Sequence, residues 1–323
     1  MSVNSMFIHA QKQGNEAIDE SKSEYVAFCQ DIYHRHNVVT LIKQIHHMIS
    51  AVQLHRGMSM SLLAGNTLFQ ADIERLQQEL ENRLAIIEVF VNQTEGILSS
   101  HDKEKLQQAW LTIRHDWHDD TLLDNFELQS HFIEQLMAMI GTLAQRLLEP
   151  LPNNGTGIEI EVEKVYPSTF RTLELLNFLS PQFIQLIELL AKIRGLSTHA
   201  ASAGRVEYMQ DRKLRYLVQC AKEHNERSRH QAKRLGTLWG NQLSSLSDIA
   251  TSEMKVLFLF NTVEMDILGG TEIAMESHQL FKLASEIIDT YFKILEDGWD
   301  VIRCQLDKDM EAWIRTASIP KTH

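Results

Sequence analysis

Residues 41–63 read LIKQIHHMISAVQLHRGMSMSLL, and this stretch sets the fold class because its apolar residues recur every three or four positions. That spacing places them on one face of an α-helix. Stripes of the same kind run through most of the chain, for example Leu76, Leu80, Leu84 and Ile87, and Leu128, Phe132, Leu136, Met139 and Leu143. The sequence therefore predicts an all-α protein.

Glycine, proline and short polar residues divide the stripes into roughly eight helices. We expect breaks near Gly65, Ser99–Ser100, Asp119–Asp120, Pro150, Gly204, Gly240 and Gly269–Gly270. The strongest break is PLPNNGTG at residues 150–157, which no helix crosses because proline lacks the N–H and clashes with the preceding turn. Residues 158–163 alternate with period two, and we interpret them as linker because no second strand pattern exists to pair with them.

This central break divides the chain into two halves. We expect a flexible N-terminal segment at 1–20, a helical bundle at 21–149, a linker at 150–166 and a second bundle at 167–318. Each half carries an Arg-Gly-apolar-Ser core, at residues 56–59 and 194–197. Because an internal repeat implies that the halves are built alike, we expect two pseudo-repeated four-helix bundles packed together.

Both arginines of these cores, Arg56 and Arg194, fall on the apolar stripe of their helix. A guanidinium on a buried face needs a compensating group, because removing a lone charge from water is costly. One interpretation pairs each arginine with an internal carboxylate, such as Glu88 or Glu188, or extends the charged end past the stripe into water. In the other, the two guanidiniums converge between the halves and hold one small planar anion.

Two segments around these cores carry a family resemblance. The first segment is VQLHRGMS at 52–59, followed by LLAG at 62–65 and Phe69. The second joins Tyr166 and the stripe at 173–176 to LAKIRG at 190–195. Together they resemble the nitrate- and nitrite-sensing (NIT) domain family. The resemblance covers most of residues 30–318, and the two arginine segments are its specific part.

The resemblance implies two four-helix bundles with nitrate or nitrite held by arginines between them. On that basis Arg56 and Arg194 are the anion ligands, and the other site residues that we expect are Gly57, Ser59, Gly195 and Ser197. The glycines would remove side-chain bulk where a helix or a ligand approaches. Family members usually carry an output module for which this chain leaves no room, so we expect a protein partner to receive the signal, with a homodimer left open. The alternative is a helical protein–protein interaction scaffold without a small ligand.

Composition and motifs set the remaining expectations. The net charge of −12 opposes nucleic-acid binding, and the basic residues from Arg205 to Arg234 alternate with acidic ones, as on a solvent-facing helix. A cytoplasmic protein without membrane contact is favoured by the absence of a signal peptide or long apolar span, and by three isolated cysteines, Cys29, Cys220 and Cys304. Because phosphate-loop, dinucleotide and nucleophile-elbow motifs are missing, we expect a binding protein without a cofactor, not an enzyme.

One run carries the residue types of a metal site. In HDWHDD at 115–120, two histidines three residues apart would share one face of a helix and could hold a metal ion. A solvated helix end is the better interpretation of so polar a run. A di-iron bundle is also disfavoured, because no histidine follows a glutamate by three residues. We therefore expect no bound metal.

Overall fold

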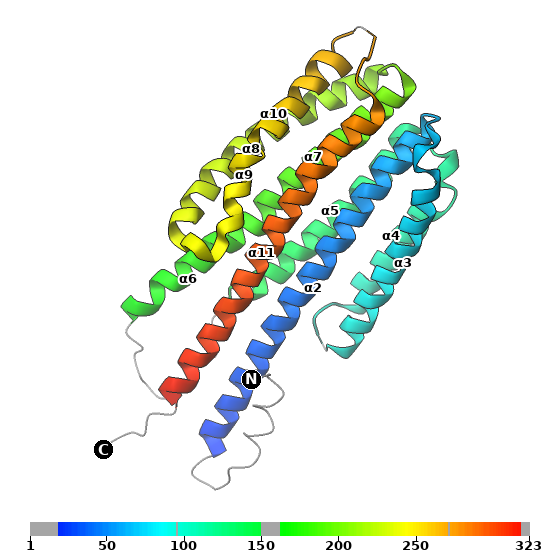
Figure 1. Cartoon of the computed structure of the whole chain (residues 1–323). Coiled ribbons are helices and arrows are strands. Elements are labelled where there is room, and N and C mark those ends of the chain that lie inside the picture. The colour runs from blue at the N-terminus through cyan, green and yellow to red at the C-terminus, as the bar shows by residue number, and fades with distance from the viewer. Residues whose placement is uncertain (1–18, 95, 150–161, 271, 318–323) are drawn as a thin grey trace.

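A computed structural model describes residues 19–94, 96–149, 162–270 and 272–317 (Figure 1). Every regular element in these ranges is helical and none is a β-strand, which confirms the all-α prediction. Among the helices described, none has the length and apolar character needed to cross a membrane.

The chain order of the helices is as follows. The first half contains α2 (Asp19–Leu63), α3 (Gln70–Gln93), α4 (Ser100–Arg114) and α5 (Leu122–Arg146). The second half contains α6 (Val162–Asn177), the π-helical turn η4 (Phe178–Phe183), α7 (Ile184–Ala203), α8 (Tyr208–Trp239), α9 (Ser247–Thr251), α10 (Glu253–Thr262), the π-helical turn η6 (Val263–Ile267) and α11 (Ser277–Ala317). Short 3-10 turns are η2 (Thr67–Phe69), η3 (Trp117–Asp119) and η5 (Gly240–Leu246).

Helix ends fall close to the breaks that glycines and capping residues predict. The hydroxyls of Ser99 and Thr121 accept hydrogen bonds from main-chain N–H groups in the first turns of α4 and α5. Gly204 ends α7 with a φ of 66°, a left-handed conformation that costs glycine little. These caps satisfy main-chain groups that a helix leaves unpaired at its ends.

The helices differ from the predicted segment bounds at two places. The helix α2 starts at Asp19, just before the predicted end of the N-terminal segment 1–20. The expected linker at 150–166 is too long, because α6 starts at Val162. The apolar residues from Val162 onward recur with helical spacing through Val165 and Leu173, a continuation that the period-two pattern at 158–163 hid. Residues 150–161, with most of that pattern, lie outside the described part of the chain.

Four long helices occupy the centre of the molecule: α2, α5, α7 and α11. The helix α2 packs against α5, α7 and α11, and α7 also packs against α11. On one side α3 and α4 lie beside α2 and α5, and on the other α8, α9 and α10 lie beside α7 and α11 (Figure 1). The two halves therefore meet mainly where α2 packs against α7 and α11.

The core contains most of the predicted stripes. Leu41, Ile45 and Ile49 of α2 are fully buried, as expected. Leu128 of α5 is exposed, contrary to its place in the predicted stripe. The inner face of α5 near its start instead carries polar side chains together with a phenylalanine, and these buried residues are Asn125, Phe126, Gln129 and Ser130.

Candidate functional site

Arg56 is fully buried in α2, as its position on the stripe predicts. Its Nη1 and Nη2 donate to the two carboxylate oxygens of Glu188 in α7, at 2.7 and 3.1 Å, and Nη1 also donates to the Ser130 hydroxyl of α5 at 2.8 Å. The guanidinium lies over the Phe126 ring, 5.5 Å from its centroid. Pairing with an internal carboxylate is therefore right for Arg56, and the partner is Glu188. Glu88 lies exposed on α3.

Arg194 lies equally deep in α7, with 2% of its surface exposed. Its Nη1 donates to the Ser285 hydroxyl of α11 at 2.9 Å, and its Nη2 donates to the main-chain carbonyl of Gln53 at 2.7 Å. The guanidinium lies over the Phe281 ring, 4.9 Å from its centroid. Within the described ranges, no salt bridge joins Arg194 to a carboxylate.

The electrostatic setting of Arg194 reflects this lack of a counterion. Burial lowers the pKa of Arg194 to about 10, the positive charge of Arg56 contributes to the decrease, and Asp289 and Glu188 oppose it. Burial also raises the pKa of the half-buried Asp289 carboxyl, although the charge of Arg194 acts in the opposite direction. Arg194 is still protonated at neutral pH, so two buried cations face one paired carboxylate.

Three buried polar atoms in this arginine cluster, which we define as Arg56, Arg194, Glu188 and Gln53, have no hydrogen-bond partner. They are Nε of each arginine and Oε1 of Gln53, whose Nε2 donates to Glu188 at 2.8 Å. An unpaired buried polar atom costs about 1–3 kcal/mol, so such atoms are rare in folded proteins. The cluster therefore carries N–H donors and positive charge that the residues described around it do not satisfy.

Gly57 and Gly195 allow α2 and α7 to approach closely at the cluster. A Cβ built on Gly195 would stand 3.9 Å from Cα of Gly57 and 2.9 Å from the sulfur of Met60. A Cβ built on Gly57 would stand 2.8 Å from the Phe281 ring and 3.4 Å from Nε of Arg194. Both glycines therefore serve the close contact of the halves.

The expected serines do not join the cluster. The Ser59 hydroxyl donates to Asn125 Oδ1 at 2.8 Å, and the Ser197 hydroxyl donates to the main-chain carbonyl of Ile193 at 2.6 Å. Three residues along a helix correspond to a rotation of about 60° and almost a full turn of rise, which separates each serine from the face that carries its arginine. The structure thus brings together the arginines and glycines of the two cores but leaves Ser59 and Ser197 outside.

The hydroxyls that do contact the guanidiniums come from a second repeat that the sequence analysis missed. Residues 126–130 read FELQS and residues 281–285 read FKLAS, so both follow the pattern Phe-x-Leu-x-Ser. In each copy the phenylalanine ring lies against the guanidinium and the serine accepts a hydrogen bond from it. Aligning the last long helix of each half would have revealed this pattern, which we call the Phe-Ser segment.

His55, next to Arg56, belongs to a separate hydrogen-bond network. Its Nδ1–H donates to Gln129 Oε1 at 2.9 Å, and its Nε2 accepts from Gln77 at 3.1 Å. Burial lowers the pKa of His55 to about 4, so the ring is neutral at pH 7. Trp110 and Trp117 contact the ring edge to face, at centroid distances of 5.4 and 5.9 Å. Because both ring nitrogens have partners, this network holds α2, α3 and α5 together and offers no free ligand group.

The ionisable side chains of two other candidate motifs lie at or near the surface. Residues 115–120 follow the end of α4 at Arg114, and Asp116 has a φ of 51°, so the two histidines do not share a helical face. No group of three or more metal-ligand side chains gathers among the residues that the structure describes. The basic residues of α8 form ion pairs with acidic neighbours, such as Arg215 with Asp211 and Lys213 with Glu127.

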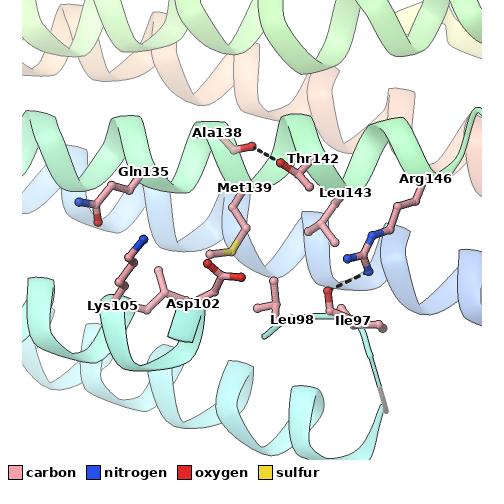
Figure 2. Close-up of a pocket in the computed structure, with 11 residues that line it drawn as sticks. Ile97, Leu98, Asp102, Lys105, Gln135, Ala138, Met139, Thr142, Leu143 and Arg146 are labelled. Atoms are coloured by element: carbon pink, nitrogen blue, oxygen red, sulfur yellow. Dashed lines mark hydrogen bonds between the residues drawn. The ribbon is translucent and has the colours of Figure 1, made fainter. Parts of the chain in front are cut away.

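A cavity of about 290 Å³ lies away from the arginine cluster, between α4 and α5 (Figure 2). Asp102, Lys105 and Met139 line it, and Arg146 at its edge donates to the main-chain carbonyl of Ile97 at 3.0 Å. None of the six residues expected in the site lines this cavity.

Comparison with known proteins gives no match: no family model, curated protein or solved structure matches the chain. The similarity to the NIT family therefore remains an expectation that rests on the two arginine segments. The function has to be argued from the arginine cluster itself.

Proposed function

We propose that the protein is a sensor of a small inorganic oxyanion, nitrate or nitrite, which binds at the arginine cluster between α2 and α7. The observation that carries the proposal is the charge imbalance: of two fully buried guanidiniums, only that of Arg56 forms an ion pair with a carboxylate among the described residues. A buried cation without a counterion is costly. A bound monoanion would supply the missing charge and accept hydrogen bonds from the unpaired Nε–H groups.

The matched surroundings of the arginines support the architecture that we propose, in which the halves are two pseudo-repeated four-helix bundles. Each guanidinium contacts the Phe-Ser segment of the last long helix in its own half, α5 or α11. Each arginine is also followed by a glycine at the contact of α2 with α7. In each half, an arginine from one helix contacts the Phe-Ser segment of the last long helix. An anion between the two arginines would therefore lie where two similarly built halves meet.

The chemistry of the cluster favours a planar monoanion. Arginine donates through a rigid planar fork, which matches two oxygens held in one plane. Nitrate and nitrite present such a pair of oxygens and carry one charge, the size of the excess at the cluster. Sulfate is tetrahedral and carries two charges, so it would leave a buried negative charge in place of a positive one.

The position of the cluster fits sensing better than catalysis. Nitrogen donors and charge are present there, but the cluster contains no nucleophile beside a base. An anion that contacts both halves can change how α2 and α7 pack, provided that it binds one packing arrangement more tightly than another. We propose that a partner protein recognises this change.

Melting experiments on the purified chain test the proposal. Nitrate and nitrite, compared with chloride and sulfate at equal ionic strength, should raise the melting temperature of the wild type, because ligand at one hundred times its Kd adds about 2.7 kcal/mol of stability. Arg194→Met should lose this response, whereas Arg75→Met, which removes an exposed arginine of α3, should keep it. If Arg194→Met unfolds, Arg194→Lys replaces it, since lysine keeps the charge without the fork. A wild type that melts alike in nitrate, nitrite and chloride would refute the proposal.

A helical interaction scaffold without a small ligand is the second candidate, and one observation favours it. Exposed apolar side chains follow one another at helical spacing along α10 and η6: Met254, Leu257, Phe258 and Met265. An exposed apolar stripe of this kind is typical of a surface that contacts another protein. A pure scaffold would show no melting response to any of the anions, and Arg194→Met and Arg75→Met would then behave alike in each of them.

A further inference from the structure

Glu188 occupies the place that an anion would need at Arg56. We propose that Glu188 is a tethered competitor for the anion site, displaced from Arg56 by the ligand and received by Lys192. This inference rests on the proposed function and adds to it how the site is regulated.

The geometry of the Glu188 carboxylate supports the competition. Its two oxygens accept from both Nη atoms of Arg56, and one of them also accepts from Nε2 of Gln53. A nitrate or formate ion presents two oxygens in one plane at a similar spacing, so it can accept the same three hydrogen bonds. Two anions cannot share these donors, since their oxygens would overlap and their charges would repel. Binding at Arg56 therefore requires the Glu188 carboxylate to leave.

Lys192 is close enough to be the main cationic partner of the Glu188 carboxylate after it leaves Arg56. It follows Glu188 by one turn of α7, and its Nζ lies 3.7 Å from Oε1 of Glu188 and 3.0 Å from Oε1 of Glu134 in α5. Charges alternate along this path from the surface inward: Glu134 is 54% exposed, Lys192 14%, Glu188 1% and Arg56 0%. A rotation of the Glu188 side chain toward Lys192 exchanges one cationic partner for another.

The charges along the path also favour the exchange. Without ligand, ion pairs join two cations (Arg56 and Lys192) to two carboxylates (Glu188 and Glu134). Arg194 forms no ion pair in the described ranges, and the half-buried Asp289 acts on its charge from beyond ion-pair distance. A monoanion between the arginines would give Arg194 the direct charged partner that it lacks. The carboxylate therefore does not have to leave the neighbourhood of the cluster, only to change partners within it.

The test is a double-mutant cycle on nitrate affinity, measured by calorimetry with the full chain. Glu188→Gln should bind nitrate at least about tenfold more tightly than the wild type, because the charged competitor is gone. Lys192→Met should weaken nitrate binding about three- to tenfold in the wild-type background, since displaced Glu188 loses its receiver, and should have no effect in the Glu188→Gln background. Lys43→Met is the matched control, because Lys43 is also largely buried and pairs with one exposed carboxylate, Asp300.

The outcomes separate this inference from the proposed function. If the wild type binds nitrate and Glu188→Gln binds it no more tightly, or if Lys192→Met weakens both backgrounds equally, the exchange is wrong and the anion site stands. If the wild type and every Glu188 variant bind neither nitrate nor nitrite, the proposed function itself fails. If Glu188→Gln unfolds in chloride but folds in nitrate or formate, the competition is supported. If Glu188→Gln unfolds in every anion, Glu188→Asp replaces it in the test. The shorter aspartate keeps the charge but makes a weaker contact with Arg56, so Glu188→Asp should bind nitrate more tightly than the wild type.

Discussion

Arg56 and Arg194 begin the same Arg-Gly-apolar-Ser pattern in the two halves, yet among the described residues only Arg56 forms an ion pair with a carboxylate. Each contacts a serine and a phenylalanine of its own half, so the difference lies elsewhere. Glu188 stands six residues before Arg194, and Ser50 stands six residues before Arg56. Because Glu188 reaches across to Arg56, while serine at position 50 supplies no charge for Arg194, a single position makes the repeat asymmetric. A repeated sequence core can thus give one arginine a carboxylate partner and leave the other with neutral partners.

The buried residues near the two arginines also differ in polarity between the halves. In the first half, His55, Gln129 and Asn125 belong to a buried hydrogen-bond network. If the arginines and the Phe-Ser segments are aligned, the corresponding residues of the second half are Ile193, Ala284 and Leu280. The first half therefore depends on neutral buried polar groups where the second half depends on apolar packing.

The largest effect that we expect distinguishes the two arginines. Arg56→Met removes the two charged hydrogen bonds that hold the Glu188 carboxylate in the core and leaves it only the longer contact with Lys192, so it should cost about 3–5 kcal/mol of unfolding free energy. Arg194→Met strands no paired carboxylate and removes one of the hydrogen bonds that the Gln53 carbonyl accepts within α2, so in chloride buffer it should cost about 1–3 kcal/mol at most. Urea denaturation of both variants measures the difference. Equal losses would show that the two positions are alike in energy and would remove the asymmetry.

A smaller effect concerns pH. Burial lowers the pKa of His46 to about 3, with contributions from His47 and Lys43, and burial lowers that of His55 to about 4. Such a histidine stays neutral in the folded protein but takes up a proton in the unfolded chain. The free energy of unfolding therefore decreases as the pH falls below the unfolded pKa of about 6.5, until the folded pKa is reached. Each of the two histidines should lower the free energy of unfolding by about 2–3 kcal/mol between pH 6.5 and 4.5.

The residue that corresponds to His46 in the second half is Ile184, so a substitution can test where this acid sensitivity arises. Neither ring nitrogen of His46 has a hydrogen-bond partner, and His46→Leu should leave stability at pH 7 unchanged or improved while reducing its loss at pH 4.5 by about 2–3 kcal/mol. His131→Leu, at an exposed position of α5, serves as the control. An unchanged pH profile for His46→Leu would place the acid sensitivity elsewhere.

The smallest effect compares the glycines. An added methyl group at Gly57 meets the Phe281 ring, which lies against Arg194, whereas at Gly195 it meets the flexible side chain of Met60. Gly57→Ala should therefore cost about 1–3 kcal/mol and Gly195→Ala clearly less. Gly141→Ala is the matched helical control, because its methyl group meets nothing within 4 Å and should stabilise α5 by about 0.5–1 kcal/mol. Thermal unfolding compares all three variants. If Gly57→Ala lost less stability than Gly195→Ala, the contact at Gly57 would not be the more restrictive of the two.

Much of the fold follows from local rules that act within one helix. The spacing of Leu41, Ile45 and Ile49 predicts the buried face of α2, and the stripe position of Arg56 predicts its burial. The choice of Glu188 over Glu88 as its partner depends on how α2 lies against α7, a contact between distant segments that the pattern of neither helix encodes.

Ser59 and Ser197 lie outside the arginine cluster for the same reason. The repeated cores suggest them as site residues, but each hydroxyl that contacts a guanidinium comes from a facing helix. The serines of α5 and α11 do so because those helices pack against α2 and α7. Their own repeat, Phe-x-Leu-x-Ser, is visible in the sequence but gains meaning only when each copy is paired with an arginine in another helix.

Because α2 is long, a small tilt of this helix at Gly57 becomes a large displacement at its far end. Arg56 lies near one end of α2, 37 positions along the chain from the other end at Asp19. At 1.5 Å per residue this arm is about 55 Å long, so a tilt of only about 2° at the glycine contact would move the far end by about 2 Å. An anion that altered the contact of α2 with α7 by a fraction of an ångström would therefore move that end far enough for another protein to detect.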